Sequence, residues 1–101
     1  MDDFPAKLAA CTGFDWDEGN ADKNWERHGV TNAECEQVFF QRPILIAPDL
    51  EHSQDEERFA ALGKSALDRQ LTLVFTIRGT LIRLISARDM SRRERKVYER
   101  T

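Results

Sequence analysis

The fold is decided by residues 71–87, which read Leu71-Thr72-Leu73-Val74-Phe75-Thr76-Ile77-Arg78-Gly79-Thr80-Leu81-Ile82-Arg83-Leu84-Ile85-Ser86-Ala87. Two runs rich in β-branched and large apolar residues flank the short connection Arg78-Gly79-Thr80. Such runs favour β-strands, and a glycine in so short a connection indicates a hairpin. Because Arg-Gly is a weaker turn sequence than Asn-Gly, the pairing register stays open by one residue. The clearest prediction from the sequence is therefore an antiparallel hairpin.

Three further strands are expected on the N-terminal side of this hairpin. The apolar run 44–47 ends at Pro48, which indicates a strand followed by a turn. A polar, acidic loop follows, and residues 58–66 then form a weaker strand. Further upstream, residues 14–17 alternate apolar and acidic side chains, a pattern typical of a short edge strand with one polar face.

A first helix is expected over residues 18–28. Asp17 is placed to cap its N-terminus, and Gly29 stands where a left-handed C-cap belongs. A stripe at helical spacing is formed by Ala21, Trp25 and His28. We therefore expect Trp25, like Trp16, to anchor the core. On that expectation, truncating Trp25 to alanine destabilises the protein by about 3–5 kcal/mol.

Two capping boxes mark the other helices. Thr31 and Glu34 start a second helix that Pro43 closes, and Ser91 with Glu94 starts a helix at the C-terminal end. The predicted element order is β-α-α-β-β-β-β-α. This order indicates an α+β fold with a mainly antiparallel sheet and the helices packed on one side.

The chain of 101 residues suits one domain. Residues 1–13 show no clear period, so we expect a loosely attached N-terminal extension and a single domain over residues 14–101. No apolar run approaches the ~20 residues of a membrane span, and the acidic N-terminus lacks a signal-peptide pattern. Cys11 and Cys35 fit no ligand spacing and no disulfide framework. A reducing cytoplasm is the expected location.

The net charge of −3 hides a sharp division along the chain. Residues 1–68 contain 15 acidic and 6 basic side chains, whereas residues 69–101 contain 9 basic and 3 acidic ones. Such asymmetry favours an anionic partner, nucleic acid first, at the C-terminal end. Internal pairing between the acidic and basic halves explains the same numbers equally well.

Arg83 is the first candidate for a functional side chain. Strict alternation places it on one face of its strand together with Leu81, Ile85 and Ala87. Residues 71–77 have one strongly apolar face that belongs against the helices, so Arg83 is expected on the open side of the sheet. A guanidinium on a rigid strand offers a planar fork for phosphate. The alternatives are a snorkelling surface arginine or an ion pair with an acidic residue of the first half.

Further charged groups lie near the expected strands. Arg88 follows the Arg83 strand, where it either shares the open face or pairs with Asp89. His52, Glu57 and Arg58 form the one local set that combines a possible acid, base and cation. A solvated acidic turn is the alternative interpretation of that set.

Basic residues also gather at two helix ends. His28 ends the first helix, where a protonated ring is favoured, although a packed or capping histidine is the commoner case. The last helix is basic on several faces through Arg92, Arg93, Arg95, Lys96 and Arg100. It suits phosphate contact or an acidic partner, and a solvated helix is the alternative. The sequence shows no glycine-rich phosphate loop and no Cys/His metal cluster, so an enzyme built from it is expected to need no metal or nucleotide cofactor.

A series of short motifs runs in order through residues 14–100. The N-terminal part contains Phe14-x-Trp16-Asp17, Asn24-x-x-Arg27-His28-Gly29-Val30 and Glu34-x-x-x-Val38-Phe39-Phe40. The remainder contains His52-Ser53-x-x-Glu56-Glu57-Arg58-Phe59, Thr76-x-Arg78-Gly79, Ile82-Arg83-x-Ile85-Ser86-Ala87-Arg88 and Glu94-Arg95-x-x-Tyr98. This composite pattern resembles the BrnT toxin family.

The resemblance implies a RelE-like microbial ribonuclease fold and the toxin role in a type II toxin–antitoxin system. Such a toxin cleaves RNA and halts translation. It is neutralised by a BrnA-like antitoxin with a ribbon-helix-helix DNA-binding domain, so operator DNA is contacted only through the antitoxin. No cofactor and no membrane are expected.

Metal-free RNA cleavage uses the 2′-hydroxyl of the substrate as the nucleophile. For catalysis we expect Arg83, Arg58 and Arg88 to stabilise the phosphate and Glu57 or His52 to transfer the proton. For RNA binding we expect Arg78, Arg92, Arg93 and His28. The alternative function is a non-catalytic interaction module, either a decayed toxin or an adaptor, that binds an acidic partner. Direct DNA binding lacks a helix-turn-helix spacing.

Overall fold

The predicted hairpin forms the centre of the fold. The computed structural model describes residues 6–52 and 55–101, and the side chain of His52 lies outside the described part. β4 (Gln70–Arg78) and β5 (Leu81–Asp89) pair antiparallel, with Arg78 opposite Leu81. Gly79 adopts a φ of 63°, in the left-handed region that glycine occupies without steric cost. The register that the sequence left open is thereby settled at a two-residue connection.

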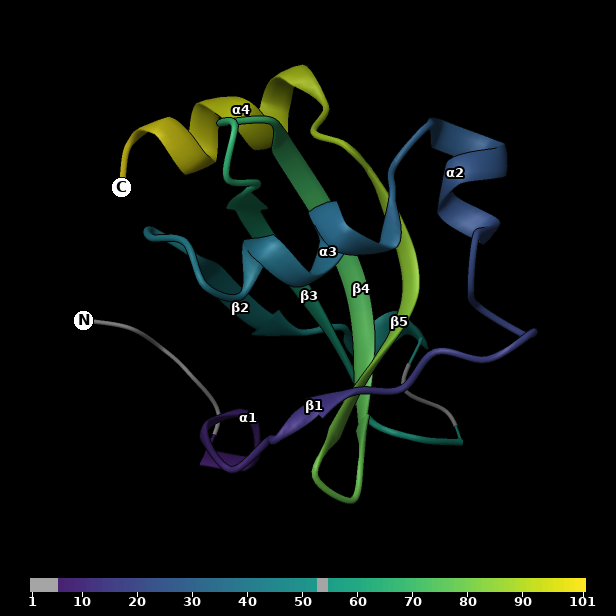
Figure 1. Cartoon of the computed structure of the whole chain (residues 1–101). Coiled ribbons are helices and arrows are strands. Elements are labelled where there is room, and N and C mark those ends of the chain that lie inside the picture. The colour runs from purple at the N-terminus through teal and green to yellow at the C-terminus, as the bar shows by residue number, and fades with distance from the viewer. Residues whose placement is uncertain (1–5, 53–54) are drawn as a thin grey trace.

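A mixed five-stranded sheet is built around this hairpin in the order β1-β5-β4-β3-β2 (Figure 1). β3 (Arg58–Lys64) and β2 (Leu45–Pro48) extend it antiparallel beyond β4. β1 (Gly13–Phe14) pairs in parallel with β5 at the opposite edge. The strand expected over residues 14–17 is therefore corrected, because the sheet includes only Gly13 and Phe14 and the chain leaves it afterwards.

The helices follow the predicted order. They are α2 (Lys23–His28), α3 (Asn32–Val38) and α4 (Arg92–Glu99), and both predicted capping boxes are present. The order β-α-α-β-β-β-β-α is confirmed, with two additions: α1 (Ala6–Ala9) and the 3-10 turn η1 (Leu50–His52). Within the described ranges, no helix is long and apolar enough to cross a membrane.

The start of α2 differs from the prediction. The helix begins at Lys23 rather than at residue 18, because Asp17 does not cap it. The Asp17 carboxylate instead accepts a hydrogen bond from the Gly19 N–H at 2.8 Å, which holds the preceding residues in a loop. The C-terminal end is as predicted, with Gly29 at a φ of 64°.

The face that α2 buries also differs. Asn24 is only 4% exposed, and its side-chain oxygen accepts a hydrogen bond from the Ala87 N–H at 2.8 Å. Trp25 is 58% exposed, so the expectation that it anchors the core is wrong. The short helix docks on β5 through a polar contact rather than through an apolar stripe. Trp16, by contrast, is half-buried against the core as expected.

One side of the sheet carries α2, α3 and the main core. Leu71, Leu73 and Phe75 are fully buried beneath these helices, and Phe75 packs edge-on against Phe39. A β-carbon at Gly63 would lie only 2.6 Å from a methyl group of Val38. Glycine at this position of β3 is therefore what allows α3 to approach the sheet so closely.

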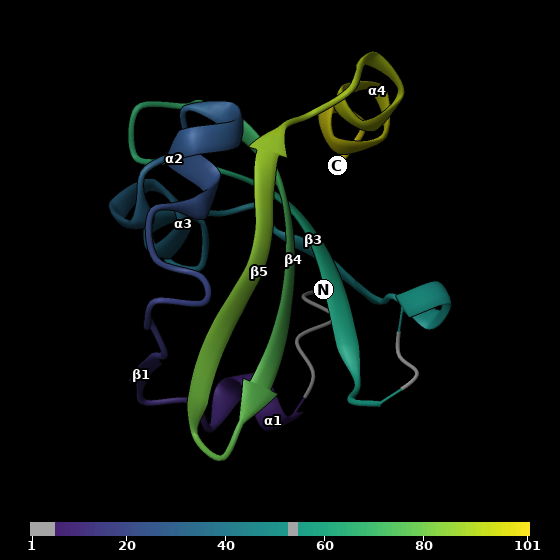
Figure 2. The same ribbon diagram turned by 90° about the vertical axis from the view of Figure 1, so that its right-hand side faces the viewer.

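α4 lies on the opposite side of the sheet from α2 and α3 (Figure 2). The expectation that all helices pack on one side is therefore wrong. Thr72 alternates with Leu71 and Leu73, so its hydroxyl points away from the core, and it donates a 2.8 Å hydrogen bond to Glu94 of α4. The Tyr98 hydroxyl donates a 2.7 Å hydrogen bond to the Pro43 carbonyl. These polar contacts hold α4 across the second face.

A β-bulge in β5 decides which side chains share a face. The ladder with β4 shifts at this point so that Ile85 is an extra residue, and the alternation inverts beyond it. Ala87, expected beside Arg83, is instead fully buried in the core. Arg88, five positions after Arg83, therefore joins Arg83 on the face opposite α2 and α3.

The N-terminal residues that the structure describes are packed onto the domain. Leu8 of α1 is only 6% exposed and belongs to the core cluster. The Thr12 N–H donates a 2.7 Å hydrogen bond to the Thr80 carbonyl at the hairpin turn. The expectation of a loosely attached extension is therefore wrong for residues 6–13, because a buried leucine and a backbone hydrogen bond fasten them.

The exposure of Trp25 leads to a stability prediction. We expect Trp25→Ala to lower the free energy of unfolding by only about 1 kcal/mol, since more than half of the side chain is exposed. Phe75→Ala, in the fully buried core, is expected to cost about 3–5 kcal/mol. Urea unfolding of both variants beside the wild type measures this difference. Equal losses for the two variants would contradict the exposed position of Trp25.

Candidate functional site: the arginine face of the sheet

Three predicted site residues lie on one face of the sheet. We call this surface the arginine face: the side opposite α2 and α3 that carries Arg58, Arg83 and Arg88. Thr76 of β4 is the register partner of Arg58 on one side and of Arg83 on the other. Since directly paired residues project to the same side, the two arginine side chains leave the sheet on either side of Thr76 from neighbouring strands.

Arg83 is held by two carboxylates from the segment that follows β1. Its Nη1 and Nη2 atoms each donate a 2.9 Å hydrogen bond to Asp17, and Nη1 lies 3.5 Å from Asp15. Hydrogen bonding from Arg83, followed by the Gly19 amide, lowers the pKa of Asp17. The Arg83 side chain is 13% exposed. The ion pair with the acidic half, one of the alternatives for this residue, is therefore formed.

The loop that presents Asp17 is itself fixed to the sheet. The side-chain amide of Asn20 donates to the Asp15 carbonyl at 2.9 Å and to the Leu84 carbonyl at 3.0 Å, while its oxygen accepts from the Asp17 N–H at 2.8 Å. A β-carbon at Gly19 would lie 3.1 Å from Arg83 Nη2. The sequence does not predict this arrangement, because Asp17 also fits a helix cap. The available signal is the glycine and the asparagine that follow Asp17.

Arg88 pairs with Glu94, not with the Asp89 carboxylate. Its Nη1 and Nη2 atoms donate to the two Glu94 oxygens at 2.7 and 2.9 Å, and Nη1 also reaches the Asp89 backbone carbonyl. Glu94 accepts further hydrogen bonds from the Ser91 N–H and from Thr72. Hydrogen bonding, with Arg88 as its largest source, lowers the pKa of Glu94 to about 2. Arg88 thus belongs to the contacts that hold α4 on the sheet.

The acidic side of the predicted site lies beside β3. Glu57 precedes Arg58; its carboxylate is 3.2 Å from Lys7 Nζ, and its backbone carbonyl accepts a 2.7 Å hydrogen bond from Thr76. Arg78, at the hairpin end, pairs with Glu56 at 3.2 Å. His52 ends η1, and its side chain lies outside the described residues.

The remaining predicted site residues lie apart from Arg58, Arg83 and Arg88. His28 is exposed at the end of α2, and Arg92 and Arg93 are exposed on the first turn of α4. Within residues 6–52 and 55–101, neither Arg92 nor Arg93 forms an ion pair, unlike Arg78, Arg83 and Arg88. The same range contains no group of three or more His, Cys, Asp or Glu side chains arranged to hold a metal ion.

Fold and site together define a class of protein: a small α+β domain with guanidinium groups on a rigid sheet face, a geometry that suits phosphate. Residues 16–94 match the family of the ribonuclease toxin, BrnT, of type II toxin-antitoxin systems. The match covers most of the 101 residues, and the chain belongs to this family. No curated protein matches it. Family membership confirms the resemblance and implies an RNA substrate and an antitoxin partner.

The Glu94 contacts generate a prediction about acid stability. The folded-state pKa of about 2 lies below the ~4.3 of an unfolded chain. The stabilisation is therefore fully present above pH ~4.3 and is lost as the pH falls toward 2. We expect Glu94→Gln to cost about 2 kcal/mol of unfolding free energy at pH 7 and only a small fraction of that at pH 2, where about half of the folded-state carboxylate is still ionised.

Urea unfolding at pH 7, 5, 3 and 2 measures this dependence. Glu99→Gln is the matched control, since Glu99 lies on the same helix and is exposed. A deficit in Glu94→Gln that persists unchanged at pH 2 would contradict the assignment.

Proposed function

We propose that this chain is a metal-independent endoribonuclease toxin that cleaves RNA in the cytoplasm and thereby inhibits translation. The observation that carries the proposal is the row Arg58–Thr76–Arg83 in a member of the BrnT ribonuclease family. The proposal includes a RelE-like fold, a ribbon-helix-helix antitoxin, and operator DNA contacted only through that antitoxin.

The chemistry follows from the substrate. The 2′-oxygen of RNA attacks the adjacent phosphorus, the bond from phosphorus to the 5′-oxygen breaks, and a 2′,3′-cyclic phosphate and a 5′-hydroxyl result. A base takes the proton of the 2′-hydroxyl, and an acid returns one to the leaving 5′-oxygen. Cationic donors must stabilise the negative charge that builds on the phosphoryl oxygens. Guanidinium groups supply that charge without a metal ion.

We assign charge stabilisation to Arg83 and Arg58. Their strands lie on either side of β4, so their backbones are about 10 Å apart, and arginine side chains can reach one phosphate between them. A guanidinium has five N–H donors, and Asp17 takes two of those on Arg83. In this proposal the remaining donors bind the phosphate while Asp17 fixes the plane of the group. Arg88, fastened to Glu94, adds positive charge at the α4 end of the arginine face.

Proton transfer is proposed for Glu57 or His52. Glu57 is exposed and directly precedes Arg58, and its carboxylate forms an ion pair with Lys7. His52 stands on the preceding turn, and an imidazole titrates near neutral pH. For the RNA strand beyond the cleaved bond, we propose contacts to Arg78, Arg92, Arg93 and His28.

A second candidate function is supported by the ion pairs. Arg78, Arg83 and Arg88 are each bonded to a carboxylate, which lowers the positive potential of the arginine face. A toxin that has lost catalysis fits this pairing, and the exposed Arg92 and Arg93 of α4 would then meet the acidic partner protein. Cleavage assays separate the two candidates.

Arg83 is the decisive residue for catalysis. We expect Arg83→Ala to lower RNA cleavage by at least about 100-fold and to abolish growth arrest, because one transition-state donor is lost. Because the substitution also removes the ion pairs with Asp17 and Asp15, thermal unfolding is recorded beside the assay to show that the variant is folded at the assay temperature. The assay uses total RNA in EDTA, where wild-type cleavage should persist.

Arg27→Ala, which removes an exposed arginine of α2, is the matched control and should retain full cleavage. An Arg83→Ala protein that still arrests growth would refute the assignment. Wild-type cleavage that stops in EDTA and returns with Mg²⁺ would refute metal independence. Tight binding of an acidic protein without any cleavage would favour the second candidate.

The exposed cations of α4 generate a prediction about RNA affinity. Removing Arg92 and Arg93 together should weaken binding and reduce the slope of log K against log salt by about 1.4, since each lost phosphate contact contributes about 0.7. Filter binding of an uncleavable 2′-deoxy oligonucleotide at several salt concentrations measures the slope. Arg100→Ala, at the C-terminal end of the same helix, should leave it unchanged. An unaltered slope in the double variant would remove these residues from the RNA path.

A further inference from the structure

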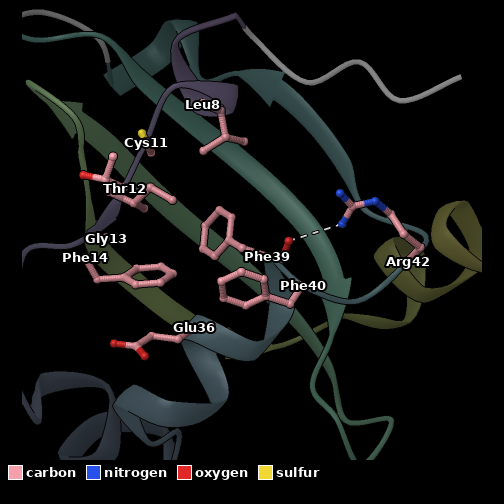
Figure 3. A pocket seen from close by; sticks show the side chains of 10 residues that line it. Leu8, Cys11, Thr12, Gly13, Phe14, Glu36, Phe39, Phe40 and Arg42 are labelled. Carbon is pink, nitrogen blue, oxygen red and sulfur yellow. Dashed lines mark hydrogen bonds between the residues drawn. The ribbon is translucent and has the colours of Figure 1, made fainter.

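A groove of about 570 Å³ lies between the N-terminal segment and the C-terminal end of α3 (Figure 3). Its buried surface is formed by Leu8, Phe39 and Ile82, each less than a tenth exposed. The Phe14 ring contacts both phenylalanines at the C-terminal end of α3: its centroid lies 5.6 Å from that of Phe39 and 6.4 Å from that of Phe40. The groove is therefore lined mainly by aromatic and aliphatic side chains.

Phe40 is the unusual member of this set. It is 74% exposed, whereas its neighbour Phe39 is almost completely buried. The Phe40 ring lies in water beside an open apolar groove. Covering this ring with a partner would remove apolar surface from water and would therefore favour binding. Aromatic side chains in this setting are typical anchors of protein interfaces.

Two charges of opposite sign lie on either side of the rings (Figure 3). The Glu36 carboxylate accepts a 2.7 Å hydrogen bond from the Trp16 ring N–H, which fixes its position. Arg42 donates to the Phe39 carbonyl at 3.2 Å and to the Gln41 carbonyl at 3.0 Å. The complementary ligand is a segment with large apolar side chains in the middle and a basic residue toward Glu36.

The groove and the arginine face lie on different sides of the sheet. Ile82 points into the groove, and Arg83, the next residue of β5, points to the arginine face. An RNA strand has no large apolar side chains to bury, and its phosphates are repelled by Glu36. The chemistry of the groove therefore fits a polypeptide better than the substrate.

We propose that this groove is the docking site of the antitoxin, which inserts the apolar side of an amphipathic segment over Phe39 and Phe40. The proposal rests on the proposed function only in taking the partner to be the antitoxin of this toxin. Phe14, on the groove wall, directly precedes Asp15 and Asp17, which hold Arg83. A partner seated here thus contacts the segment that positions the guanidinium without covering the arginine face.

The test compares Phe40→Asp with Leu67→Asp in the full chain. Leu67 is 93% exposed and lies outside the groove, so it is a control for adding a carboxylate in place of an exposed apolar side chain. The probe is the purified product of the reading frame adjacent to the gene of this chain, taken as the candidate antitoxin, and its binding is measured by titration calorimetry. We expect Phe40→Asp to weaken binding by at least about 100-fold and Leu67→Asp to leave it within threefold. Both variants should melt like the wild type.

A charge swap adds a second arm. Glu36→Lys should weaken binding, and reversing the basic residue of the antitoxin that faces it should restore binding. In cells, the variants Phe40→Asp and Leu67→Asp should each arrest growth when expressed without the antitoxin. Co-expressed antitoxin should then rescue Leu67→Asp but not Phe40→Asp.

Antitoxin binding to Phe40→Asp within threefold of the wild type would overturn the proposal. Loss of RNA cleavage with unchanged antitoxin binding would also overturn it, since the groove would then serve the substrate. Failure of the wild type to arrest growth or cleave RNA would count against the proposed function alone, because the calorimetric arm needs no catalysis.

Discussion

The bulge at Ile85 is the constraint on which both faces of the sheet depend. One extra residue in β5 inverts the alternation beyond it, so Ala87 turns into the core and Arg88 turns to the arginine face. The Ala87 N–H then meets Asn24, which docks α2. Arg88 meets Glu94, which docks α4. Without the extra residue, Ala87 would face away from the core and Arg88 would project into it.

Charge pairing is the second organising feature, and it extends from one end of the chain to the other. Asp17 is joined to Arg83. Arg69, directly before β4, donates to Asp89 and Glu34 and to the Gly29 carbonyl, so it ties the turn between α2 and α3 to the C-terminal end of β5. Acidic side chains of the first part of the chain thus form ion pairs with basic side chains of the last part inside the folded domain. The cations that remain without an ion pair in the described part of the chain include Arg92 and Arg93 of α4.

In the function proposed above, this distribution separates the surface that binds RNA from the surface that binds the antitoxin. The arginine face carries donors held in place by carboxylates, an arrangement that reduces the reorganisation needed when a phosphate arrives. The groove beside Phe40 is apolar and lies across the sheet from those donors. Because β1 joins the groove wall to the loop that holds Arg83, the two surfaces share one short segment of backbone. A partner bound in the groove would therefore contact the same backbone segment that positions Arg83.

The sequence by itself determined the features that depend on neighbours in the chain: the hairpin, both capping boxes, the element order and the motifs of the BrnT family. It also placed Arg83 on the open face, since that needs only strand alternation up to Ile85. Only the tertiary structure decided that Trp25 is exposed, that α4 crosses the second face, and that Arg83 pairs with Asp17. Each of these depends on contacts between residues far apart in sequence, such as Asn24 with Ala87 or Thr72 with Glu94. Local propensity and periodicity contain no information about such contacts, because their free energy appears only when the distant segments meet.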